Sequence, residues 1–162
     1  MDRRSLIGAL AGAAVIAPSA EAAEAAGVAD IPARFADALN AHDLDRFAAL
    51  FSGDYVNHQW SAAAPRPSPG APPKKGTVAF FAARLAGLPD LKVSVETSLA
   101  AGDKVAASFV YEGTQTGVYL GVPPTGKKLR FTSCDIFRVA DGRIVEHWGM
   151  GDIAGVLAQM KS

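Results

Sequence analysis

The spacing of apolar residues predicts a helical first half for this chain. Apolar positions recur three and four residues apart over 31–39 and over 44–51, which is typical of amphipathic helices. A third helix is predicted over 77–89, where Phe80, Phe81 and Leu85 share one face. The expected N-caps of the three helices are Asp30, Asp43 and Thr77.

The second half of the chain changes to a strand pattern, in which apolar and polar residues alternate. The alternating segments are expected to pair as two hairpins, 91–99 with 104–115 and 128–139 with 143–150. Ala140-Asp141-Gly142 is a strong turn signal between the last two. A short strand is expected earlier, over 55–58, and a closing amphipathic helix over 153–160. This order predicts an α+β domain with helices on one side of a strongly curved antiparallel sheet.

Two segments are predicted to be loops. Residues 61–76 contain five prolines, which favours an irregular surface loop. Residues 117–126, which include Pro123-Pro124, are expected to link the two hairpins.

The N-terminal segment has the pattern of an export signal. Arg3 and Arg4 precede an apolar run that ends at Pro18 and is too short to span a membrane. Small residues then suit signal-peptidase cleavage near Ala22 or Ala23. The paired arginines resemble a twin-arginine signal, and Sec export and an N-terminal helix of the mature domain are the alternatives. We therefore expect a signal peptide (1–22), a linker (23–29), one domain (30–162), and a periplasmic or secreted protein without a stable membrane span.

Composition narrows the function classes. The 162 residues include 16 basic and 16 acidic side chains, and the basic ones are scattered, so nothing predicts a nucleic-acid partner. Cys134 is the single cysteine, which excludes an intramolecular disulfide and a cysteine-based metal site. Apolar residues make up 49% of the chain, a fraction that the N-terminal segment inflates. The fold must therefore rest on its apolar core.

An ordered set of short segments resembles the SnoaL-like polyketide cyclases, or ester cyclases, of the nuclear-transport-factor-2-like superfamily. Among them are Asp54-Tyr55-Val56-Asn57-His58 and Glu146-His147-Trp148. The full set, in the family's order, is 40–45, 54–58, 88–91, 101–106, 113–117, 121–126, 135–138 and 141–148. The resemblance covers nearly all of residues 30–160.

This resemblance implies a cone-shaped α+β domain with N-terminal helices on the concave face of the sheet, an apolar pocket between them, and commonly a homodimer. It also implies ring closure of a polyketide ester by an acidic general acid/base, without metal or organic cofactor. A carboxyl group in an apolar pocket suits that chemistry, since burial raises its pKa toward neutrality. In the cyclases an Asp directly follows the His-Trp pair, whereas this chain has Gly149 there.

Four titratable residues are candidates for the chemistry: Asp152, His147, His58 and Asp135. Asp152 is the next acid after Gly149, and its alternative role is to cap the last helix. His147 either faces the pocket or is a hydrogen-bonded buried histidine, because neighbours on a strand point to opposite faces. His58 ends the early strand at a pocket mouth or forms part of a turn. Asp135 lies in an apolar strand, where a carboxylate must face the pocket or pair with Arg138 or Arg143.

Aromatic residues on the predicted strands and loops are expected to wall the pocket: Trp148, Tyr111, Tyr119 and Phe131. The three histidines, His42, His58 and His147, show no metal-ligand spacing, so no metal site and no cofactor is predicted. The expected partner is a small apolar molecule.

Three functions are consistent with these patterns. The leading hypothesis is a cyclase-type enzyme that transfers protons in an apolar pocket. The alternative is an exported, non-catalytic protein that binds a small molecule, which the export signal and Gly149 both favour. A third is a dimeric interaction module, because one fold hosts many functions.

Overall fold

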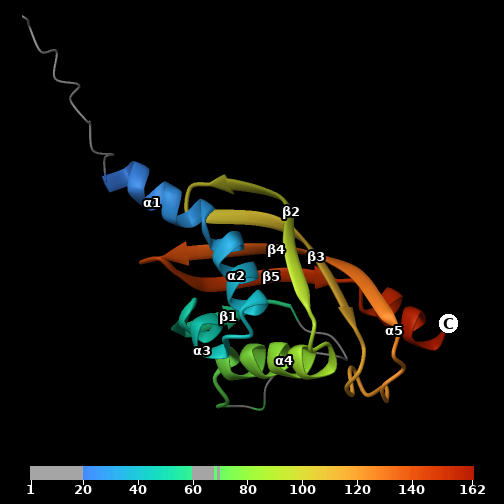
Figure 1. Cartoon of the computed structure of the whole chain (residues 1–162). Helices are drawn as coiled ribbons and strands as arrows, with labels where there is room; N and C mark the ends of the chain where they lie inside the picture. Colours follow the sequence, from blue (N-terminus) through green and yellow to red (C-terminus); the bar gives the residue numbers. More distant parts are fainter. Residues whose placement is uncertain (1–19, 60–67, 69) are drawn as a thin grey trace, which may run out of the picture.

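The computed structural model describes residues 20–59, 68 and 70–162 (Figure 1). Its elements in chain order are α1 (Ala20–Ala29), α2 (Ile31–Asn40), α3 (Leu44–Ala49), β1 (Phe51–Asn57), α4 (Pro73–Gly87), β2 (Lys92–Ala101), β3 (Lys104–Thr114), β4 (Lys128–Ala140), β5 (Arg143–Gly151) and α5 (Ile153–Lys161). Of the predicted signal peptide, residues 1–19 lie outside the described residues. Residues 23–29, expected as a linker, are part of the helix α1, and Val28 is buried.

The helix starts follow the sequence only in part. Asp43 caps α3, because its carboxylate accepts a 2.8 Å hydrogen bond from the backbone N–H of Arg46. Asp30 has helical backbone angles and makes no side-chain cap, so its predicted capping role is wrong. Thr77 is not a cap either, since α4 already begins at Pro73. Proline is well suited to a first helical turn, because the N–H that it lacks has no partner there.

One sheet of five strands forms the second layer, in the order β1-β5-β4-β3-β2. Both predicted hairpins are present, and Asp141 and Gly142 turn the second with φ angles of 50° and 68°. The α+β class is confirmed. The sheet is mixed, however, because β1 runs parallel to β5, with Asn57 opposite His147. No hairpin joins these two strands, so their connection does not impose the antiparallel direction that was expected.

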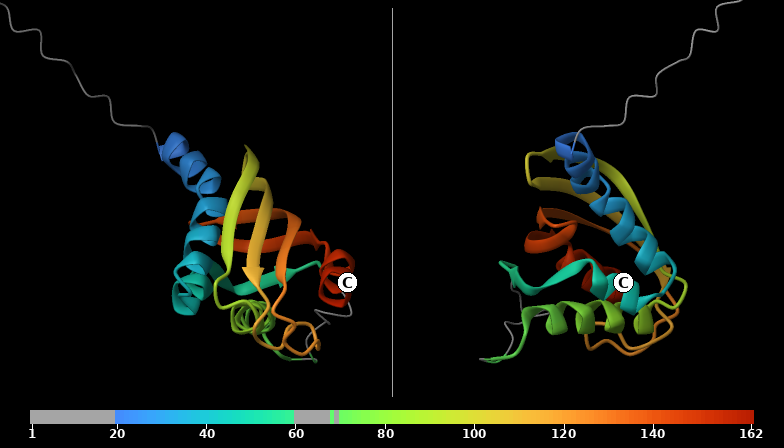
Figure 2. Two further views of the ribbon diagram at one scale, coloured as in Figure 1. Left: turned by 45° about the vertical axis from the view of Figure 1, so that its right-hand side comes forward. Right: turned by 90° about the vertical axis from the view of Figure 1, so that its left-hand side faces the viewer.

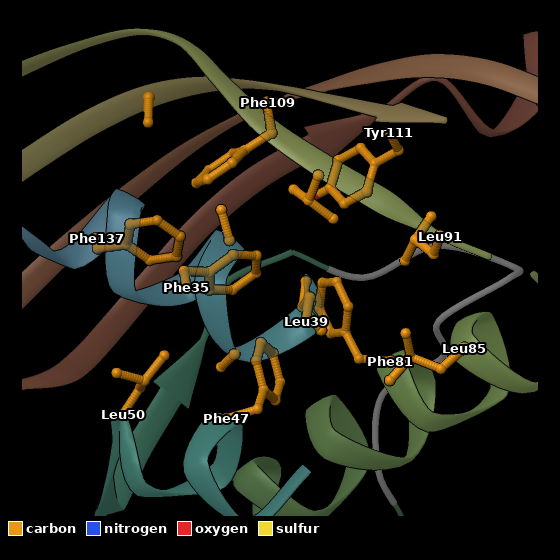
Figure 3. Packing of buried hydrophobic residues seen from close by; sticks show 14 of the residues in the cluster. Phe35, Leu39, Phe47, Leu50, Phe81, Leu85, Leu91, Phe109, Tyr111 and Phe137 are labelled. Carbon is orange, nitrogen blue, oxygen red and sulfur yellow. The ribbon is translucent and has the colours of Figure 1, made fainter. Parts of the chain in front are cut away.

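The sheet curls over the helices and encloses the core between the two layers (Figure 2). Phe35 of α2 lies at the centre of that core (Figure 3), with its ring centroid 5.0–5.6 Å from those of Phe47, Phe81, Phe109 and Phe137. These rings come from two other helices and two strands, so one side chain ties both layers together. In the described part of the chain, none of the helices has the length and apolar character of a membrane span.

The side chain of Asn40 fixes the end of α2 against the edge strand β2. Its amide oxygen accepts a 2.7 Å hydrogen bond from the N–H of Val93, and its amide nitrogen donates a 2.9 Å bond to the carbonyl of the same residue. The amide thus satisfies backbone groups that an edge strand otherwise leaves open.

The connection between β3 and β4 is organised by the buried Gln115. Its amide nitrogen donates hydrogen bonds to the carbonyls of Gly117, Val122 and Pro123, and its amide oxygen accepts from Thr125. The predicted linker is therefore an ordered loop.

Candidate active site

A cavity of about 530 Å³ lies between α4, the concave face of the sheet, the loop over 118–121 and the start of α5. Much of its wall is apolar. The polar side chains on that wall are Asn57, Gln59, Thr77, Arg84, Tyr111, Tyr119, Ser133, Asp135 and His147. The size and the mixture of apolar surface with a few polar groups are typical of small-molecule sites.

Asp135 of β4 and His147 of β5 form a pair in this cavity. The Oδ1 atom of Asp135 lies 2.7 Å from Nε2 of His147, and their side chains are 10% and 12% exposed. Because two acceptors cannot approach so closely, a proton lies between these two atoms. The strand register explains the meeting, since Asp135 is opposite Gly149 and His147 is opposite Phe137, which puts both side chains on the concave face.

Tyr55 holds the other nitrogen of His147. Its hydroxyl oxygen lies 3.2 Å from Nδ1 of the imidazole, and Thr77 donates a 3.5 Å hydrogen bond to the same hydroxyl. Burial raises the pKa of Tyr55 above its ordinary value, and the Asp135 carboxylate adds to the effect. The hydroxyl therefore keeps its proton at neutral pH, and Tyr55 and Asp135 together fix the plane of the imidazole.

Ser133 holds the second oxygen of Asp135. Its hydroxyl donates a 2.5 Å hydrogen bond to Oδ2, and the hydroxyl of Tyr111 lies 3.3 Å from the serine oxygen. Burial raises the pKa of Tyr111, so this phenol also keeps its proton. Both oxygens of Asp135 are thus anchored, and the carboxyl can accept a proton or return one without moving.

Replacing Tyr55 by Phe is expected to slow proton transfer at the Asp135–His147 pair by about 3- to 10-fold, the equivalent of one ordinary hydrogen bond of about 0.5–1.5 kcal/mol. The ring would still fill its place in the core, while Nδ1 of His147 would lose its partner. The pH profile of the rate separates orientation from packing, because a loss of packing alone would leave the profile in place.

Gly149 explains how Asp135 fits into this site. A Cβ atom at residue 149 would overlap Oδ1 of Asp135, and it would lie 2.5 Å from Nε2 of His147 and 2.6 Å from Oε1 of Gln59. A side chain at 149 would therefore displace the groups of the pair. The position that carries an Asp in the cyclases this chain resembles is empty of side chain here, and the carboxylate opposite it in the register fills the space.

Two of the candidate residues are placed away from the cavity wall. Asp152 caps α5, accepting a 2.8 Å hydrogen bond from the N–H of Gly155, and it is exposed. His58 lies on the outer side of the sheet, where its Nε2 is 2.7 Å from Glu146 and its ring stacks on Trp148. Neither residue reaches the Asp135–His147 pair.

The contacts of Glu146 on the outer face of the sheet also bear on the alternative role of Asp135, which was an ion pair with Arg138 or Arg143. Arg138, considered above as its ion-pair partner, instead contacts Glu146 at 2.5 Å. Hydrogen bonds from His58 and Arg138 lower the pKa of the Glu146 carboxyl. Asp135 pairs with His147 and is free of both arginines.

Of the four aromatic residues predicted to wall the pocket, two lie on the cavity wall and two do not. Tyr111 and Tyr119 line the cavity. Phe131 is buried and stacks on Tyr111, with ring centroids 5.1 Å apart, one layer behind the wall. Trp148 lies on the outer face with His58, because it shares a strand side with Glu146.

Sequence reasoning missed several polar residues of the site. No sequence pattern marks Tyr55, Ser133 or Gln59 as site residues. The pattern around Thr77 predicts a helix N-cap and not a residue of the site. Arg84 did carry a signal, since it follows Phe80 and Phe81 by four and three residues and so shares the apolar face of its helix. Among the residues that the structure describes, no three His, Cys, Asp or Glu side chains come together as a metal site.

Comparisons with known proteins agree with this architecture. A family model described as SnoaL-like polyketide cyclase matches residues 29–160. IdmH of Streptomyces antibioticus, a proposed polyketide cyclase, is 34% identical, with a TM-score of 0.69 over 82% of this chain and 97% of that one. TsrD of Streptomyces laurentii is 25% identical, with a TM-score of 0.70 over 83% and 95%.

A third similar structure differs in its described activity. AclR of Streptomyces galilaeus, a proposed hydroxylase, is 26% identical, with a TM-score of 0.72 over 85% of this chain and 86% of that one. Among curated proteins, none matches this sequence. The architecture therefore does not by itself identify one reaction, and the reaction depends on the side chains that line the cavity.

Proposed function

Because the chain belongs to the SnoaL-like polyketide cyclase family, we propose that it is a cyclase-type enzyme that moves a proton on a small, largely apolar carbonyl compound. The observation that carries the proposal is the hydrogen-bonded Asp135–His147 pair on the wall of the cavity. The pair supplies an acid/base group without a metal or an organic cofactor.

The proposed reaction is an intramolecular ring closure. Asp135 removes a proton from a carbon that lies between two carbonyl groups, and the electron pair of that C–H bond becomes an enolate. The enolate carbon then forms a C–C bond to a third, more distant carbonyl carbon of the same molecule, and the resulting alkoxide takes the proton back from Asp135. The cavity contributes by holding the chain folded so that the two carbons meet.

A test of the first step does not need the natural substrate. Ethyl benzoylacetate carries a CH2 group between a ketone and an ester, and ¹H NMR in D2O follows the loss of that signal. We expect the protein to accelerate the exchange above the buffer rate, at a pH where the buffer rate is slow. Exchange at the buffer rate with an excess of protein would overturn the proposal.

A second candidate function is an exported protein that binds a small molecule without converting it. The export signal predicted over residues 1–22 favours this reading, since ring closure of antibiotic type is normally intracellular work. The same exchange experiment separates the two, because a binder would protect or ignore the CH2 group. Native mass spectrometry of protein from its own host would then identify a retained molecule.

We propose in addition that the outer face of the sheet is a homodimer interface. Val56, Ile136 and Met150 are 43%, 41% and 74% exposed there, beside the half-buried Trp148. The strand register places Ile136 opposite Trp148 and Cys134 opposite Met150, so these side chains form one patch. A contiguous apolar patch on a sheet face suits a self-complementary contact with a second copy.

Replacing Met150 by Lys is expected to weaken the dimer by at least about tenfold, because a charge would be buried in the contact. Light scattering coupled to size exclusion measures the shift. The matched control is Ala41→Lys, since Ala41 is exposed at the end of α2, on the helical side of the molecule. Equal behaviour of both variants would contradict the interface.

A further inference from the structure

Arg84 is a buried cation that the proposed proton transfer does not use. It lies on α4, is 4% exposed, and lines the cavity. Its Nε atom donates a 2.9 Å hydrogen bond to the hydroxyl of Tyr119. Within the described ranges, no carboxylate oxygen lies within 4.0 Å of its guanidinium group. The charge is therefore buried without a counter-ion from this part of the chain.

Aromatic rings surround the guanidinium. Its Cζ atom lies 4.9, 4.8, 4.6 and 5.2 Å from the ring centroids of Phe80, Phe81, Tyr111 and Phe131. Such cation–π contacts stabilise a cation but do not neutralise it. Burial of a charge is costly unless it is paired, so the site is prepared for an anion from outside the protein.

The two Nη atoms of Arg84 make no hydrogen bond to a described residue, since the 2.9 Å bond to Tyr119 is donated by Nε. Among the described residues, Ser52 Oγ is the polar side-chain atom that is fully enclosed and has no hydrogen-bond partner, so the Nη atoms of Arg84 are not fully enclosed. The Nη atoms, which also lack a partner, therefore keep accessible surface, and that surface belongs to the cavity that Arg84 lines. Two free Nη groups match the two oxygens of a carboxylate.

Tyr111 connects this cation with the acid/base pair. Arg84 lies over its ring, and its hydroxyl contacts Ser133, which in turn holds Asp135. We propose that Arg84 binds the carboxylate of an apolar ligand that extends through the cavity, with its far end at Asp135. That this ligand is the substrate rests on the function proposed above, whereas the anion site does not.

Binding of two isosteric probes tests the site. The probes are 2-naphthoate and the neutral 2-naphthamide, measured by calorimetry on the full chain at one pH and salt concentration. We expect wild-type protein to bind the naphthoate at least about tenfold more tightly than the amide. Arg84→Met, which keeps an apolar side chain of adaptable shape among the rings, should remove the preference. Arg130→Met, at an exposed arginine of β4, should retain it.

The outcomes are separable from those of the exchange experiment. Equal affinities in wild-type protein, or a preference that persists in Arg84→Met, would overturn the anion site. Arg84→Lys covers the case in which Arg84→Met does not fold, because it keeps the charge and loses the two-pronged geometry, so the preference should shrink without vanishing. Ethyl benzoylacetate is neutral, so its exchange by wild-type protein reports on the proposed function alone.

Discussion

Replacing Asp135 by Asn is expected to lower the exchange rate of ethyl benzoylacetate about 10²- to 10⁴-fold, the usual contribution of a positioned general base. The amide oxygen can still accept the hydrogen bond from Nε2 of His147, and the amide nitrogen can donate to Ser133. Shape and hydrogen bonds are thus retained, while the basic oxygen is lost. The exchange rate per protein, followed by ¹H NMR, measures the effect.

The matched control is Asp152→Asn. Asp152 is exposed and caps α5, and asparagine caps a helix as well as aspartate does. Its exchange rate and melting temperature should stay close to those of the wild type. If the two variants lost activity equally, the base would not be Asp135, and the placement of Asp152 outside the cavity would have to be reconsidered.

The local elements were within reach of sequence patterns because their causes are local. Alternation and the Asp141-Gly142 turn specify the second hairpin, and Asp43 specifies the start of α3. The direction of β1 was not within reach, since alternation within one strand says nothing of the strand beside it. The predicted start of α4 was wrong because Thr77 is an acceptable N-cap and Pro73 an acceptable residue of a first turn, and the helix begins at Pro73.

The sequence predicted which residues could form the candidate site but not on which face of the sheet each of them lies. Asp135 and His147 were both named, but their pairing depends on the register of β4 against β5, which places them on one face. The same register places His58 with Glu146 on the other face. Arg84 was missed because a helix pattern does not reveal whether an arginine on the apolar side extends to solvent or stays enclosed.

Gly149 shows why an apparent loss in the sequence need not be a loss of chemistry. The motif Glu146-His147-Trp148 lacks the acid expected next, and that absence alone favours a non-catalytic protein. In three dimensions the space beside His147 holds Asp135 from the neighbouring strand. A side chain at 149 would compete with Asp135 for that space, because its Cβ would overlap Oδ1 of the carboxylate.

Replacing Gly149 by Ala is therefore expected to reduce exchange about as strongly as Asp135→Asn, by 10²-fold or more, because a displacement of about 1 Å in a catalytic group has that effect. The added Cβ would overlap Oδ1 of Asp135 and lie 2.5 Å from Nε2 of His147, so both side chains must shift from this geometry. The downfield ¹H NMR signal of the proton between these two atoms should disappear, which measures the geometry independently of the rate.

Gly151→Ala is the matched control on the same strand, since its Cβ would meet nothing closer than 3.9 Å and the proton signal should persist. A Gly149→Ala protein with full activity and an intact proton signal would show that the pair is not the reacting group.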